Sequence, residues 1–143
     1  MRAVLDTNII IDLLHFADPQ ARALRSAIDD GSLQCFSDRR CLEELQRVVA
    51  YPQFSLDAAA QRVLIERYCR FVTLCEAVGV EDYLLPRCRD ADDQKFLILG
   101  VRCRADLLIT RDQELLRLVR RRRPAPSCAI VTAQGAAALL AGC

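Results

Sequence analysis

Five short apolar segments are spaced along the chain, and stretches with apolar residues at helical spacing separate them. The segments are Arg2–Leu5, Leu33–Phe36, Phe71–Leu74, Ala105–Ile109 and Ala129–Val131. Nearly continuous apolar character is typical of strands that are buried on both faces, whereas half-exposed strands alternate. Strands of this kind alternating with helices predict an α/β fold in which three α/β/α layers enclose a central parallel sheet.

Length and composition limit the classes of protein to which the chain can belong. Its 143 residues predict a single domain over residues 1–143, and 52% hydrophobic residues are enough for a proper core. Asp6 and Asp12 interrupt the first apolar run, and no run could span a membrane, so we expect neither a signal peptide nor a membrane segment. We therefore expect a cytoplasmic protein whose eight cysteines stay reduced, and the absence of a Cys-x-x-Cys spacing argues against zinc.

Capping residues and prolines predict where the helices begin and end. The first two expected helices cover residues 8–16 and 18–30, and the third is capped by Ser37 and ended by Tyr51-Pro52. The fourth is capped by Asp57, and its inward-facing residues are Val63, Leu64, Tyr68 and Phe71. The fifth begins at Asp92 or a neighbour, the sixth runs from Asp112 to Arg122, and the last lies in the alanine-rich tail. A loop is expected between Glu76 and Ala91.

Carboxylates gather at the predicted strand ends. Asp6 follows the first strand directly, and Asp112 follows the fourth strand after Thr110. Others lie on the helices that leave or enter these strands, namely Glu43, Glu44, Asp90, Asp92 and Asp93. Because function in parallel sheets collects at the carboxyl ends of the strands, carboxylates from four segments can reach one rim.

Such a cluster of acids suits the hard divalent ions Mg²⁺ and Mn²⁺. Crowded carboxylates repel one another, and some would be protonated at neutral pH unless a cation enters. Two such ions about 3.5–4 Å apart can activate water and stabilise the leaving oxygen of a phosphodiester. Helix capping explains Asp92, Asp93 and Asp112 one at a time, but Asp6 beside a buried strand needs partners. The one histidine, His15, argues against nucleases that use histidine pairs.

Four motifs, in order, resemble those of PIN-domain ribonucleases, which occur as toxins in bacterial toxin–antitoxin pairs. They are Val4–Asn8, then Leu42–Val48 with Tyr51–Phe54 behind it, then Asp90–Leu97, and finally Ala105–Asp112. The similarity extends from residue 2 to about residue 118. Each motif alone is weak evidence, and their order makes the resemblance specific.

The resemblance implies catalytic and metal-binding roles for Asp6, Glu44, Asp93 and Asp112. Glu43 competes with Glu44, and Asp90 and Asp92 compete with Asp93 for the same roles. Supporting positions, which would orient carboxylates by hydrogen bonds, are Asn8, Thr110 and Asp90. The implied reaction is Mg²⁺- or Mn²⁺-dependent hydrolysis of single-stranded RNA that leaves a 5′-phosphate and a 3′-hydroxyl. An antitoxin protein and a homodimer are the partners that the resemblance implies.

Cations flank the acids and have two interpretations. Arg39, Arg40, Lys95 and Arg111 either bind RNA phosphates or are solvated helix faces. The run Arg120–Arg123 either complements the end of the sixth helix or contacts RNA or an antitoxin.

Two other classes of function compete with the nuclease. One is a catalytically silent PIN-like module that binds RNA or protein. The other is a phosphatase or receiver domain. Asn8 argues against a phosphatase, because it occupies the position where a phosphatase needs its second Asp. Neither a glycine-rich phosphate loop nor a nucleophile elbow is present in the sequence.

Overall fold

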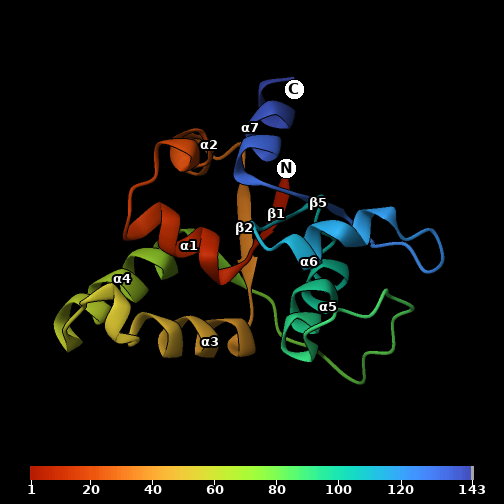
Figure 1. The fold of residues 1–143 in the computed structure, drawn as a ribbon, viewed down its shortest axis with the longest axis horizontal. Helices are drawn as coiled ribbons and strands as arrows, with labels where there is room; N and C mark the ends of the chain where they lie inside the picture. The colour runs from red at the N-terminus through yellow and green to blue at the C-terminus, as the bar shows by residue number, and fades with distance from the viewer. Residues whose placement is uncertain (143) are drawn as a thin grey trace.

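A five-stranded parallel sheet lies at the centre of the protein, in a computed structural model that describes residues 1–142. The strand order is β3-β2-β1-β4-β5, and each neighbouring pair is parallel. The strands are β1 (Arg2–Leu5), β2 (Gln34–Ser37), β3 (Val72–Leu74), β4 (Leu107–Ile109) and β5 (Ala129–Val131). The predicted three-layer α/β architecture is confirmed, with helices on both faces of the sheet (Figure 1).

Helices fill the segments between the strands. The α-helices are α1 (Thr7–Leu14), α2 (Arg22–Asp29), α3 (Arg39–Val49), α4 (Ala58–Phe71), α5 (Gln94–Arg102), α6 (Gln113–Leu116) and α7 (Ala133–Ala141). Short 3₁₀ helices are η1 (Pro19–Ala21), η2 (Pro52–Phe54), η3 (Ala91–Asp93) and η4 (Arg117–Arg120). The predicted caps Asp18 and Asp57 accept hydrogen bonds from backbone amides of η1 and α4. Gly31, at a φ of 82°, turns the chain after α2, as expected of a glycine there.

Successive residues of each strand point to opposite faces and so build two separate cores. Ala3 and Leu5 of β1 pack with α1, α2, α3, α4 and α7, whereas Val4 packs with α5 and α6. Figure 1 shows α1 to α4 on one side of the strands and α5 and α6 on the other. Burial on both faces explains why Ala3–Leu5 of β1 and Leu107–Ile109 of β4 are apolar at every position rather than at alternate ones.

Three local predictions were wrong. Ser37 ends β2, and the cap of α3 is Asp38, whose Oδ1 accepts from the Cys41 amide at 2.8 Å. Val63 is 53% exposed, because the buried stripe of α4 runs through Leu64 and Tyr68, one turn apart.

The sixth helix is also shorter than predicted. It leaves α-helical geometry after Leu116 and continues as η4 only to Arg120, instead of reaching Arg122. Leu115 and Leu118, three residues apart, are both buried, and residues at that spacing share a face in a 3₁₀ turn.

The loop from Glu76 to Ala91 holds no strand or α-helix. The seven cysteines within residues 1–142 are free thiols, and Cys143 lies outside the described residues. None of the helices in that range is long and apolar enough to cross a membrane.

Candidate functional site

The carboxyl ends of β1 and β4 lie side by side at one edge of the sheet. The backbone amide of Asp6 donates to the Ile109 carbonyl at 2.9 Å, so the first residue after β1 still pairs with β4. β1 is the central strand, with β2 and then β3 on one side and β4 and then β5 on the other, so the strand order reverses direction at β1. Ligand sites in open parallel sheets form at such a reversal, and Asp6 stands in it.

Thr110 links the two acids that follow these strands. Its hydroxyl donates to Asp6 Oδ2 at 2.6 Å and accepts from the Asp112 backbone amide at 2.9 Å. Asn8 Nδ2 also donates to Asp6 Oδ2, at 3.2 Å. Asp112 Oδ1 in turn caps α6 by accepting from the Glu114 amide at 2.9 Å. The carboxylates of Asp6 and Asp112 are therefore both held by hydrogen bonds at one rim.

Glu44 is held from two sides. The Thr7 hydroxyl donates to its Oε2, and Lys95 Nζ lies 2.8 Å from its Oε1. Lys95 is only 9% exposed and also donates to the Asp92 carbonyl at 2.5 Å. Glu43, the competing acid, lies outside the cleft and pairs with exposed Arg39 at 3.3 Å.

Asp93 is the most perturbed carboxyl group of the rim. Burial, and then the charges of Asp6, Asp90 and Asp112, raise its pKa to about 7, against a small opposing effect of Lys95. Burial also raises the pKa of Asp6, although the hydrogen bond from Thr110 opposes that shift. Carboxyl groups from separate segments thus interact electrostatically and shift one another's pKa values, as expected of a cluster.

One cleft of about 350 Å³ brings the predicted acids together. Its acidic residues are Asp6, Glu44, Asp90, Asp93 and Asp112. Asp92 does not line the cleft, and Asp90 caps the 3₁₀ turn by accepting from the Asp92 amide at 2.9 Å. The geometry therefore places Glu44 rather than Glu43 in the cleft, and both Asp90 and Asp93 rather than Asp92.

The donor chemistry of the cleft fits a hard divalent cation. Apart from Arg111, its polar side chains carry oxygen atoms, and the Oδ1 atom of Asn8 is buried without a hydrogen-bond partner among residues 1–142. Carboxylates and amide oxygens are the ligands that Mg²⁺ and Mn²⁺ prefer. Within residues 1–142, no group of three or more His, Cys, Asp or Glu side chains already has the geometry of a metal site.

The predicted cations occupy three different environments. Arg111 lines the cleft and forms an ion pair with Asp12 at 2.9 Å, with 58% of its side chain exposed. Arg39 and Arg40 are exposed at the start of α3 and do not line this cleft. Lys95, expected among the surface cations, instead points inward to Glu44, so it does not offer a free ammonium group to phosphate.

The contacts that hold the side chains of the site were not identified from the sequence. Thr7 donates to Glu44, Lys95 pairs with Glu44, and Asp12 pairs with Arg111. The position of Thr7 between Asp6 and Asn8 was a usable signal, since it starts the helix beside the site. No local pattern shows that Lys95 contacts Glu44, because these residues are 51 positions apart.

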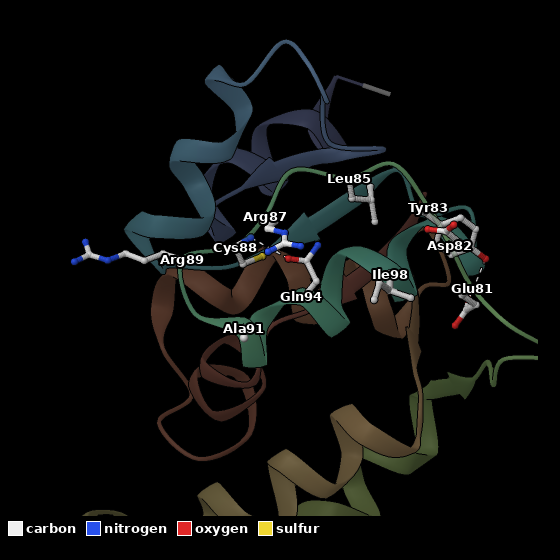
Figure 2. Close-up of a pocket in the computed structure, with 10 residues that line it drawn as sticks. All are labelled: Glu81, Asp82, Tyr83, Leu85, Arg87, Cys88, Arg89, Ala91, Gln94 and Ile98. Carbon is white, nitrogen blue, oxygen red and sulfur yellow. Dashed lines mark hydrogen bonds between the residues drawn. The ribbon is translucent and has the colours of Figure 1, made fainter.

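A larger pocket of about 610 Å³ lies between α5 and the loop that precedes it (Figure 2). Gln94 fastens this loop by accepting from the Cys88 amide at 2.9 Å and donating to the Pro86 carbonyl at 3.1 Å. Figure 2 shows Arg89 extending away from the other lining residues, and its guanidinium lies 3.4 Å from Glu114. None of the four predicted acids lines this pocket, so the smaller cleft is the candidate site.

Comparisons with known proteins agree with the fold. The sequence model of the PIN domain matches residues 2–114. No curated protein matches the chain. Among solved structures, the chain is similar to one chain of the crystal structure of VapBC2 from Rickettsia felis, which is bound to a DNA fragment from the VapBC2 promoter. That likeness has a TM-score of 0.60 and 12% identity, over 92% of this chain and 98% of the other.

Proposed function

The chain belongs to the PIN-domain family, and we propose that it is a metal-dependent endoribonuclease that cleaves single-stranded RNA. The observation that carries the proposal is the convergence of Asp6, Glu44, Asp93 and Asp112 on one cleft from four separate segments. Burial, and then the charges of Asp6, Asp90 and Asp112, raise the pKa of Asp93 to about 7, which supports the proposal. A site built to hold such charges together is suited to a cation.

Asp6, Asp93 and Asp112 would hold Mg²⁺ or Mn²⁺, with the Asn8 amide oxygen as a further donor. When bound, such an ion supplies the positive charge that assists attack of water on phosphorus and departure of the 3′-oxygen. Thr110 keeps the Asp6 carboxylate oriented through its 2.6 Å hydrogen bond. Glu44, held by Thr7 and Lys95, would orient the attacking water.

The proposed biological setting is a toxin–antitoxin pair in the cytoplasm. The four motifs resemble those of PIN-domain toxins, and the fold is similar to a chain of VapBC2. We infer an antitoxin protein as partner and a homodimer as the assembled form.

The central experiment is cleavage of an end-labelled single-stranded RNA with Mg²⁺, with Mn²⁺ and with EDTA. Wild type should cleave only with metal, and Asp6→Asn should be inactive. Glu44→Gln is compared with Glu43→Gln, which removes one charge from the neighbouring residue outside the cleft. Equal cleavage by wild type and Asp6→Asn would show that the activity is a contaminant.

A catalytically silent binding module is the second candidate. The observation that favours it is the Lys95–Glu44 pair, which already neutralises one acid of the quartet. Calorimetric titration of Mn²⁺ separates the two. A nuclease should bind the ion and lose that binding in Asp93→Asn, whereas a silent module should show no uptake of the ion in either protein.

A further inference from the structure

The cleft that holds the acids has a second, apolar half. Ile11, Val48, Tyr51 and Phe54 line it together with Gln53, and the acids line the remainder of the same cavity. Glu44 and Val48 lie one turn apart on α3, so the acidic and apolar halves follow each other along one helix, about 6 Å apart along its axis. Tyr51 continues that direction just beyond the end of α3.

Aromatic rings crowd this far end of the cleft. The His15 ring lies 5.8 Å from the Phe54 ring in an edge-to-face arrangement, and the Phe16 ring lies 6.0 Å from it. These contacts fix Phe54 from the side of α1. Tyr51 is 43% exposed and lines the cleft, so part of this residue is accessible to a ligand there.

A cation, an amide and aromatic rings thus line the same cleft as the acids. Arg111, whose side chain is 58% exposed, lines the same cleft and can approach a phosphate. Gln53 offers an amide donor and an acceptor beside the rings. Stacking rings next to cationic groups are the combination by which proteins bind single-stranded nucleic acid.

We propose that Tyr51 and Phe54 form a stacking subsite for one base of a single-stranded RNA whose backbone passes the acids of the same cleft. This deepens the proposed function, on which it rests for the kind of nucleic acid. The subsite needs no particular base, because every base has a face that can stack, so Gln53 is the residue through which a base preference would arise. A protein segment is the competing occupant of this part of the cleft. It would need only an apolar side chain at position 51, whereas a base needs an aromatic ring there.

The test is binding of two fluorescent strands of about eight nucleotides, measured by anisotropy in EDTA at low salt. One strand is oligoadenylate, and the other is an abasic ribose-phosphate strand of equal length and charge. Wild type should prefer the strand with bases. Tyr51→Ala should weaken oligoadenylate binding by about 5- to 100-fold and leave abasic binding unchanged.

Conservative and matched variants sharpen the result. Tyr51→Phe should bind like wild type, and Tyr51→Leu should be as weak as Tyr51→Ala, because leucine cannot stack. Tyr83→Ala is the control, since Tyr83 is similarly exposed, at 39%, but lines the pocket of Figure 2 and not the cleft. If Tyr51→Leu binds as well as Tyr51→Phe, the contact is merely apolar and the stacking subsite is overturned in favour of a protein occupant.

The outcome is separable from that of the proposed function. If no protein cleaves RNA but the base preference is present and lost in Tyr51→Ala, the stacking subsite stands and the nuclease fails. If wild type cleaves RNA yet Tyr51→Ala binds both strands like wild type, the nuclease stands and the stacking subsite is wrong. Absence of any base preference in wild type also overturns the subsite.

Discussion

Lys95 and Glu44 form a largely enclosed ion pair across the cleft wall, with Nζ and Oε1 2.8 Å apart and side chains 9% and 15% exposed. The pair joins α5 to α3 across the edge of the sheet, directly beside the rim acids. It gives Glu44 an environment unlike that of Asp93, whose pKa is raised to about 7 by burial and by neighbouring carboxylates. Glu44 is thus paired with a cation of the chain itself, whereas Asp6, Asp93 and Asp112 form no ion pair within residues 1–142.

Removing one member of this pair should cost more than removing both. Lys95→Met leaves the Glu44 carboxylate enclosed without its cation, and such changes cost about 3 kcal/mol of the free energy of unfolding. The double variant Lys95→Met, Glu44→Gln should recover much of that loss. Urea unfolding of wild type, both single variants and the double variant measures the coupling. Additive losses would mean that the pair contributes nothing as a pair.

The metal-free protein should lose stability as the pH rises from about 4 to about 7. Burial, and then the charges of Asp6, Asp90 and Asp112, raise the pKa of Asp93 to about 7 in the folded state, from a usual value of 3.8. Between those values the folded state binds more protons than the unfolded state, so raising the pH favours unfolding. The raised pKa of Asp6, mainly from burial, acts in the same direction.

Asp93→Asn is the variant that tests this pH dependence. In EDTA it should unfold at a higher temperature than wild type at about pH 8 and show a flatter pH profile. Asp92→Asn, which changes the neighbouring acid outside the cleft, should keep the wild-type profile. Identical profiles for Asp93→Asn and wild type would exclude Asp93 as the source.

Thr110→Val should weaken the site without changing its shape. Valine replaces the hydroxyl that donates to Asp6 and accepts from the Asp112 amide, and Thr110 is completely buried. Loss of a buried hydrogen-bonding group costs about 1–3 kcal/mol of stability, and loss of a group that orients a ligand lowers metal affinity about 10- to 100-fold. Unfolding and Mn²⁺ titration measure the two effects. Thr110→Ser keeps the hydroxyl and should keep both, and a Thr110→Val protein with wild-type Mn²⁺ affinity would contradict this role.

Arg102→Leu should loosen the loop from Glu76 to Ala91. The guanidinium contacts the Cys75 carbonyl at 2.6 Å, Asp38 at 2.9 Å and Glu81 at 2.6 Å, and so ties the loop to α5 and to the end of β2. Its loss leaves the mostly buried Asp38 carboxylate without its cation. Hydrogen exchange should therefore rise in residues 76–91 and stay unchanged in α4. An equal rise in both segments would indicate general destabilisation instead.

The positions of the strands could be predicted from the sequence, because each strand lies in a short apolar run of its own. Residues 129–131 and 2–5 are strands with the predicted bounds. The first of these strands is wholly apolar, and Ala3, Val4 and Leu5 of the second are buried. The acids at the rim followed from the same logic, because Asp6 comes directly after β1, and Asp112 follows β4 after Thr110 and Arg111. Strand order was not predictable, since it depends on which strands pair across long separations.

Side-chain partners were the part that local patterns could not reveal. The inward turn of Lys95 and the pairing of Arg111 with Asp12 depend on contacts between residues far apart in the chain. Ser37 and Asp38 are both good caps, and only the length of β2 decides between them. Glu44 was preferred to Glu43 by motif, and the helix face explains it, since only Glu44 points into the cleft.

The crowding of carboxylates at the rim has a thermodynamic consequence for the ligands of the cleft. An RNA strand brings further negative charge to Asp6, Asp93 and Asp112, so without a cation the two repel each other. A cation that relieves this repulsion must bind more tightly when RNA is present, by the same factor that it strengthens RNA binding. Each ligand of the cleft, RNA or cation, is therefore expected to bind more tightly when the other is already bound.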